Sequence, residues 1–171
     1  YDMQGIINGI DYKMYDPATD KSIYKNYSAK DFRRNKKVNK TRLQEELGLE
    51  KDPHKMLIGI VSRLTDQKGF DLVNYVMDEL CQDEVEIVIL GTGEERYENS
   101  FRYFAWKYPE KVSANIYYSE PMSHKVYASC DAFLMPSLFE PCGLSQLMSL
   151  RYGTVPIVRE TGGLKDTVEP Y

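Results

Sequence analysis

The chain has 171 residues, which is enough for one compact domain with a buried core. Hydrophobic residues make up 42% and charged residues 28%, and no apolar run approaches the ~20 residues that a membrane-spanning helix needs. The net charge of −4 and the isoelectric point near 5.3 argue against a general nucleic-acid-binding protein, because phosphate contacts need a basic face. We therefore expect a soluble protein that binds neither nucleic acids nor membranes.

The three cysteines, Cys81, Cys130 and Cys142, fit neither a disulfide framework nor a paired zinc-ligand pattern. We interpret them as free thiols of a cytoplasmic protein and predict no metal site. His54 and His124 have no nucleophile or acidic residue at an informative spacing, so both are interpreted as structural or surface residues. The amino end resembles no signal peptide, and the chain neither begins with Met nor ends in a tail, so we expect part of a longer protein.

Residues 1–55 are polar and interrupted by turn dipeptides such as Asn8-Gly9 and Asp16-Pro17. They predict an irregular lead-in segment that packs on the domain and holds one helix at 38–49, where Leu43 and Leu47 are four positions apart. The remainder of this segment is expected to be extended loop on the surface.

From residue 56 to 171 short apolar runs alternate with stretches of helical periodicity, which is typical of strand and crossover-helix units. The predicted strands are 56–61, 85–90, 112–118, 132–135 and 154–158. Apolar residues three or four positions apart predict helices near 70–80, 97–108, 126–130 and 144–148. The predicted fold is α/β, a Rossmann-like, doubly wound parallel sheet with helices on both faces.

Ligands of open parallel sheets bind beyond the carboxyl ends of the strands, and the polar motifs of this sequence follow predicted strands. Arg63 and Lys68 lie between the first strand and its helix, so both cationic groups are able to converge on one anion, such as a diphosphate. The alternative is that both are ordinary solvated surface charges. The position of the loop and the glycine at 69 favour the anion site.

A second motif surrounds Gly143, Leu144 and Ser145, which open the fourth predicted helix, and a helix amino end attracts phosphate. Ser145 is either a phosphate ligand or a capping residue of the first turn. Glu140 lies three residues earlier and either faces a sugar attached to that phosphate or only flanks the helix; spacing alone does not decide.

Three further segments have two interpretations each. Gly91-Thr92-Gly93 is not a dinucleotide fingerprint, because Arg96 stands where the third glycine belongs, so the glycines indicate a tight turn near a base or ribose. Thr161-Gly162-Gly163 is either a phosphate-contacting loop or a strand exit turn. Tyr118 either stacks on a base or belongs to the core.

The sequence resembles bacterial glycogen synthases and plant starch synthases, which are glycosyltransferases of the GT-B type built from two facing Rossmann-like domains. The resemblance covers almost the whole chain, and its most specific part is Glu-Pro-Cys-Gly-Leu at 140–144 followed by Thr-Gly-Gly-Leu at 161–164. The motifs 7–11, 62–69, 90–93 and 152–156 also carry it. It implies the carboxyl-terminal, donor-binding half of such an enzyme, without the amino-terminal acceptor domain.

The family reaction transfers glucose from ADP-glucose to the nonreducing end of an α-1,4-glucan such as glycogen, with retention of configuration, and uses no metal or other cofactor. The resemblance implies that Arg63, Lys68 and Glu140 act in catalysis, the two cations by stabilising the diphosphate that leaves. The donor-binding residues that it implies are Asn8, Gly93, Tyr118, Cys142, Gly143, Leu144, Ser145, Thr161, Gly162 and Gly163. It also implies a bacterial cytoplasmic location.

Two positions depart from related patterns. Met148 stands eight residues after Glu140, where many relatives in the wider superfamily have a second Glu, so a paired-carboxylate mechanism is not expected. Tyr15 stands where we expect Trp. Without an amino-terminal domain we expect weak ADP or ADP-glucose binding and no glucose transfer. The alternatives are a transferase for UDP-glucose or another acceptor, a non-catalytic nucleotide-binding module and, least favoured, a nicotinamide-dependent dehydrogenase.

Overall fold

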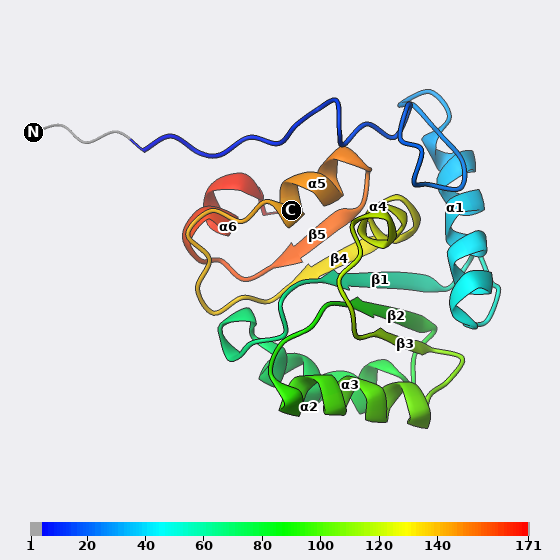
Figure 1. The fold of residues 1–171 in the computed structure, drawn as a ribbon, viewed down its shortest axis with the longest axis vertical. Coiled ribbons are helices and arrows are strands. Elements are labelled where there is room, and N and C mark those ends of the chain that lie inside the picture. The colour runs from blue at the N-terminus through cyan, green and yellow to red at the C-terminus, as the bar shows by residue number, and fades with distance from the viewer. Residues whose placement is uncertain (1–4, 171) are drawn as a thin grey trace, which may run out of the picture.

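The computed structural model describes residues 5–170, and a five-stranded parallel sheet forms its centre (Figure 1). The strand order is β3-β2-β1-β4-β5, so the chain winds outward from β1 in both directions. The strands are β1 (Met56–Val61), β2 (Val85–Leu90), β3 (Val112–Asn115), β4 (Ala132–Met135) and β5 (Val155–Val158). The doubly wound parallel sheet predicted from the sequence is confirmed.

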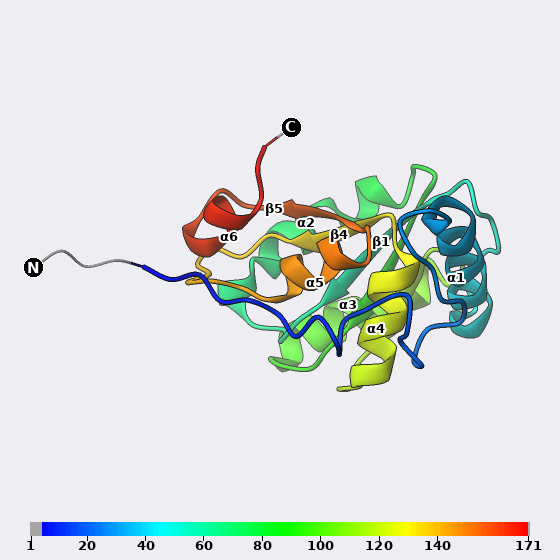
Figure 2. The same cartoon turned by 90° about the horizontal axis from the view of Figure 1, so that it is seen from above.

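Helices cover both faces of this sheet (Figures 1 and 2). They are α1 (Phe32–Leu47), α2 (Phe70–Leu80), α3 (Glu95–Lys107), α4 (Glu120–Ser129), α5 (Ser145–Arg151) and α6 (Gly162–Thr167), with a short 3-10 turn, η1 (Asp66–Lys68), before α2. α2 and α3 lie on one face, whereas α4 and α5 lie on the other. No helix within 5–170 is long and apolar enough to cross a membrane.

Alternation along the strands divides the core between the two faces. Ile60, Ile87 and Ile89 pack under α2 and α3 with Phe70 and Phe101. The intervening residues Leu57, Val88 and Leu90 face the other way and pack with α1 and α4. Successive strand residues point to opposite faces, so strands buried on both sides have the continuous apolar runs seen in the sequence.

The sequence predicted that this strand, β3, runs to Tyr118, but it ends at Asn115. Its neighbour β2 ends at Leu90, which pairs with Asn115, so an extended chain beyond this point has no partner strand. The Asn115 carbonyl accepts hydrogen bonds from the backbone N–H of Gly91 (3.1 Å) and of Tyr117 (3.0 Å), which turns the chain out of the sheet. The apolar run predicted a strand, but pairing set its length.

Helix α1 begins at Phe32, earlier than the predicted start at residue 38, and its inward face explains the error. Four polar side chains are buried there, namely Asn35, Asn39, Lys40 and Gln44. Hydrophobic periodicity finds a helix by its apolar stripe, which this helix largely lacks. The segment before α1 is also more than surface loop, because Ile23 and Tyr27 are buried against α4 and Tyr152.

Buried polar groups fasten α1 to the sheet. The Gln44 side-chain nitrogen donates to Glu86 Oε2 (2.6 Å) on β2, and both side chains are fully buried. The other oxygens, Gln44 Oε1 and Glu86 Oε1, have no partner among the described residues. Burial raises the pKa of Glu86 to about 7, although the hydrogen bond from Gln44 opposes this shift.

Replacing Glu86 by Gln is expected to remove a pH dependence from the stability of the domain. An acid whose pKa is raised in the folded state contributes to the stability of the fold below its unfolded pKa of 4.5. This contribution is lost as the pH rises towards 7. We compare the free energy of unfolding of Glu86→Gln with that of the wild type at each pH. The difference, in favour of the variant, should be roughly 2–3 kcal/mol larger at pH 8 than at pH 4.5. Urea unfolding at both pH values measures this difference, and the exposed Glu79→Gln is the matched control. An equal difference at both pH values would contradict the prediction.

Candidate functional site

The loops that follow β1, β4 and β5 meet at the carboxyl edge of the sheet, on the left of Figure 1. The backbone N–H of Leu138 donates to the Gln67 carbonyl (2.9 Å), and the Gln67 side chain donates to the Phe139 carbonyl (3.0 Å). The third loop joins them where the N–H of Gly163 donates to the Glu140 carbonyl (2.9 Å). Motifs that are far apart in the sequence therefore form one surface.

Lys68 and Glu140 form an ion pair at the centre of this surface. The ammonium of Lys68 contacts Oε2 of Glu140, and only 13% and 11% of the two side chains are exposed. The hydroxyl of Ser137 lies 3.4 Å from the same oxygen. Two nearly buried charges are tolerated here because each is the counter-ion of the other. The interpretation of Lys68 as an ordinary solvated surface charge is therefore wrong.

Gly69 brings Lys68 to this position. Its φ of 77° lies in the left-handed region, and a Cβ at this residue would stand 2.1 Å from the carbonyl oxygen of Pro136. Only glycine combines this conformation with so close an approach. The loop after β1 is thereby held against the end of β4.

Arg63 lies in the same loop but differs from Lys68 in its surroundings. Its side chain is exposed, and it has no ion-pair partner within 5–170. The convergence of Arg63 and Lys68 on one anion stays a prediction.

The segment Thr161-Gly162-Gly163 is more than a strand exit turn, because it begins helix α6, which the sequence analysis did not predict. Gly162 has a φ of 44°, and a Cβ there would lie 2.2 Å from the Glu140 carbonyl oxygen. A Cβ on Gly163 would lie 2.3 Å from Cα of Cys142. These close approaches hold the loop of Glu140 and Cys142 in place, whereas contact with phosphate stays a prediction.

Helix α5 begins at Ser145, within the predicted opening at 143–145, with Leu144 at the N-cap position and no side-chain cap. The capping interpretation of Ser145 is therefore not supported. Gln146 is a further residue of this region, absent from the predicted set; it is fully buried and donates to the carbonyls of Cys142 (2.9 Å) and Gly143 (3.1 Å). Its amide fixes the turn before α5, and no sequence pattern distinguished it from a surface glutamine.

A cavity of about 250 Å³ lies where β1, β2 and the segment after β3 end. Ser62, Gly91, Ser145 and Tyr118 line it, together with Tyr15 from the lead-in segment. Tyr118 is 86% exposed, so it is not a core residue. The cavity joins a flat aromatic wall to hydroxyl and backbone groups.

Of the ten predicted donor residues, Tyr118 and Ser145 line this cavity, and the other eight, Gly93 and Asn8 among them, do not. Gly93 packs on the backbone of Leu64, where a Cβ would lie 2.2 Å from the Leu64 carbonyl oxygen. Asn8 lines a separate hollow of about 310 Å³ with Leu147 and Arg151. Their roles stay predictions.

A larger hollow of about 760 Å³ lies along β5 and α6, but neither Lys68 nor Glu140 lines it. Aliphatic side chains such as Val155 and Ile157 form most of its wall, on the outermost strand of the sheet. We place the candidate site by its charged and hydroxyl groups, at the edge where the loops meet.

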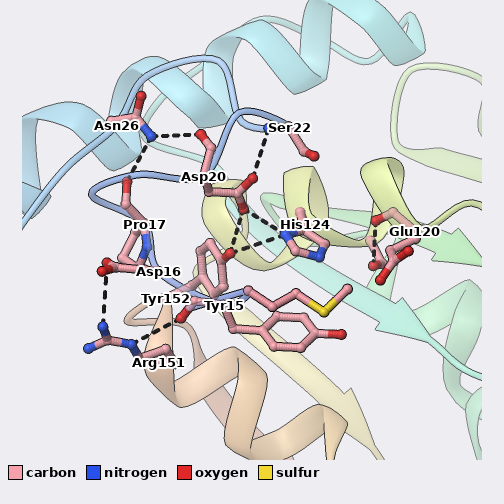
Figure 3. A network of polar contacts seen from close by, with 12 residues as sticks. Tyr15, Asp16, Pro17, Asp20, Ser22, Asn26, Glu120, His124, Arg151 and Tyr152 are labelled. Carbon is pink, nitrogen blue, oxygen red and sulfur yellow. Dashed lines mark hydrogen bonds and ion pairs between the residues drawn. The ribbon is translucent and has the colours of Figure 1, made fainter. Parts of the chain in front are cut away.

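The structure also gives His124 an acidic partner that sequence spacing did not reveal. Nδ1 of His124 lies 2.6 Å from Oδ2 of Asp20, which also accepts the hydroxyl of Tyr152 at 2.5 Å (Figure 3). Burial opposes the charge of Asp20, but the hydrogen bonds from Tyr152 and His124 outweigh it and lower the pKa of this carboxyl. Of the two predicted interpretations of His124, structural or surface residue, the first is confirmed.

A doubly wound sheet with a buried Lys–Glu pair and a small cavity of aromatic and hydroxyl groups at its carboxyl edge is typical of α/β domains that bind ligands at this edge. Residues 40–171 match the family model described as glycosyl transferases group 1. The chain belongs to this family.

Close relatives are glycogen synthases. The chain is 72% identical to that of Lachnospira eligens over 169 residues, 99% of this chain and 35% of the relative. It is 54% identical to that of Clostridium acetobutylicum, over 100% of this chain and 36% of the relative. The chain therefore spans about a third of the length of the curated relatives that it matches.

Solved structures agree with this assignment. The catalytic domain of starch synthase IV from Arabidopsis thaliana, bound to ADP and acarbose, superposes with a TM-score of 0.88 at 36% identity, over 97% of this chain and 34% of that one. Anabaena HepE in complex with UDP and glucose has a TM-score of 0.63 at 19% identity, over 95% of this chain and 40% of that one, which shows the fold alone.

Replacing Lys68 by Met is expected to lower the free energy of unfolding by about 3 kcal/mol, because it leaves the Glu140 carboxylate buried without its counter-ion. The double variant Lys68→Met, Glu140→Gln should recover most of this loss, and chemical unfolding measures both. Lys165→Met is the control, since Lys165 pairs with Glu160 on the surface, where both side chains are more than half exposed. Additive effects of the two single changes would contradict a buried ion pair.

Proposed function

We propose that this chain is the donor-binding domain of a bacterial glycogen synthase. The complete enzyme would transfer glucose from ADP-glucose to the nonreducing end of an α-1,4-glucan, with retention of configuration. The observation that carries this proposal is the ion pair of Lys68 and Glu140 at the carboxyl edge of the sheet, the same edge at which the cavity of Tyr118 and Ser145 lies. The identity of 72% to a glycogen synthase supports the choice of donor and acceptor.

Lys68 would stabilise the diphosphate as it leaves. Cleavage of the bond between the sugar and the phosphate places negative charge on the phosphate oxygen, and a fixed cation in a partly dry site stabilises that charge. An ammonium group carries three donors, so Lys68 is able to bind a phosphate oxygen while it still contacts Glu140. Arg63, in the same loop, is the second proposed cation.

Glu140 would orient the glucose. Its Oε2 is occupied by Lys68 and Ser137, which leaves the second carboxylate oxygen as an acceptor for a sugar hydroxyl. The backbone from Cys142 to Ser145, with Thr161 to Gly163 packed behind it, would contact the phosphates and the sugar. No residue in this scheme requires a metal ion or another cofactor, and independence from metals is part of the proposal.

The remaining two thirds of the relatives' length would supply the acceptor domain and the other wall of the active site. The glucan is therefore proposed as a substrate of the complete protein, and the bacterial cytoplasm as its location. A related transferase that uses UDP-glucose, and a nucleotide-binding module without catalysis, are the outcomes against which this proposal is tested.

Calorimetric titration with ADP tests the phosphate site. Lys68→Ala and Arg63→Ala should each raise the dissociation constant about 10- to 100-fold, because each change removes one charge-assisted contact. The control is Arg102→Ala, since Arg102 is an exposed cation of α3 that pairs with Glu98. Unchanged ADP binding in both variants would place the anion site elsewhere. Tighter binding of UDP-glucose than of ADP-glucose to the wild type would favour the alternative donor.

Turnover distinguishes the enzyme from a binding module. The 171-residue chain should transfer no labelled glucose from ADP-glucose to glycogen, because the cleft has one wall only, whereas the complete protein should elongate the glucan. Glu140→Gln in the complete protein should reduce kcat more than about 100-fold, since the sugar loses a charged acceptor in the transition state. Transfer by the chain alone, or no transfer by the complete protein, would contradict the proposal.

A further inference from the structure

The cavity of about 250 Å³ at the ends of β1 and β2 is lined, among the described residues, by one residue of the lead-in segment, Tyr15. The sequence motifs assign Tyr15 no role. It lines the cavity with Tyr118, Ser62, Gly91 and Ser145. Burial raises the pKa of its phenol, and Glu120 and Tyr118, which line the same cavity, add to the shift.

Both the backbone and the ring of Tyr15 are held from the body of the domain. The guanidinium of Arg151, at the end of α5, donates to the Tyr15 carbonyl (3.0 Å) and pairs with Asp16 (3.4 Å). The ring stacks on His124 of α4, with ring centroids 4.8 Å apart and planes inclined by 21° (Figure 3). An aromatic side chain fixed at both ends loses little freedom when a ligand binds against it.

His124 is itself held rigidly. Its Nδ1 hydrogen-bonds Asp20, and the side chains of the two residues are only 5% and 4% exposed. Tyr152 donates to the same carboxylate oxygen and lies edge-on to the His124 ring, with centroids 6.1 Å apart. Because a carboxylate only accepts, Nδ1 of His124 donates to Asp20, and the buried Nε2 has no hydrogen-bond partner within 5–170.

The size and chemistry of the cavity indicate which part of a nucleotide it would take. At about 250 Å³ it is smaller than the roughly 300 Å³ or more of a typical site for a whole small molecule. Aromatic rings suit a flat base, and the serine hydroxyls suit a ribose, whereas the charged pair of Lys68 and Glu140 does not line this cavity.

We propose that Tyr15 contacts the nucleoside base of the donor, and that His124, fixed by Asp20 and Tyr152, is a positioning residue that holds Tyr15 in place. This inference rests on the proposed function, since it names a further binding residue of the same donor site. It assigns the lead-in segment a direct part in nucleotide binding. It also explains why Asp20, a charged residue from that segment, is buried between α4 and α5.

Calorimetry with ADP and with inorganic pyrophosphate separates the base side of the site from its phosphate side. Tyr15→Ala should weaken ADP binding about 10-fold, the loss expected for one base-stacking aromatic, and leave pyrophosphate binding unchanged. Tyr15→Phe keeps the ring and should bind ADP within about 2-fold of the wild type. Tyr75→Ala, a change at an exposed tyrosine of α2 on the opposite face of the sheet, is the control.

Fluorescence gives a readout that a purely structural role would not change. The only tryptophan, Trp106, is exposed on α3, so Tyr15→Trp combined with Trp106→Phe places a single reporter at the proposed contact. ADP should quench this reporter saturably, and pyrophosphate should not. Adding His124→Ala should weaken the ADP response about 5-fold, and His124→Phe, which retains a ring for stacking, should restore it.

The outcomes separate this inference from the proposed function. If Lys68→Ala abolishes pyrophosphate binding while Tyr15→Ala leaves ADP binding unchanged, the role of Tyr15 is wrong and the donor site stands. If Tyr15→Ala weakens ADP and pyrophosphate binding equally, or the fluorescence of the Tyr15→Trp reporter does not respond to ADP, Tyr15 is structural only and the inference fails. If the wild type binds neither ligand, both proposals fail.

Discussion

Lys68 and Glu140 carry opposite charges on loops far apart in the sequence, and each makes the burial of the other tolerable. Removing a charge from water costs several kcal/mol unless a counter-ion replaces the lost hydration. The loop after β1 and the loop after β4 are therefore held together by an interaction that neither forms alone. Gly69 and Gly162 permit the close backbone contacts around it, and no residue with a side chain fits in their place. An anionic ligand at this edge would meet a cation that is already fixed in position.

Buried polar contacts join the lead-in segment to the domain. Asp20 accepts hydrogen bonds from two residues of the domain, His124 and Tyr152, and the inward face of α1 presents Gln44 to Glu86 of β2. Such contacts require well-defined geometry, because a buried polar group without its partner costs more than the bond contributes. They fix one position of the segment, and with it the position of Tyr15 at the cavity.

The chain spans about a third of the length of the glycogen synthases that it matches. We propose a division of labour in which this part holds the nucleotide with charged groups and an aromatic wall, and the remainder of the protein brings the acceptor. In this proposal binding and transfer are separable properties, since binding needs this chain's residues alone, whereas transfer needs them together with the other half.

The sequence by itself determined the fold class and the edge of the sheet at which the candidate site residues lie. Buried parallel strands are continuous apolar runs, so β1, β2 and β4 are readable from periodicity, and strand ends predict the edge at which Lys68, Glu140 and Ser145 lie. Only the tertiary structure decided the early start of α1, the short β3, helix α6, and the partners of Lys68 and His124. These features depend on contacts between residues far apart in the chain, and the polar residues that make them carry no periodic signal along it.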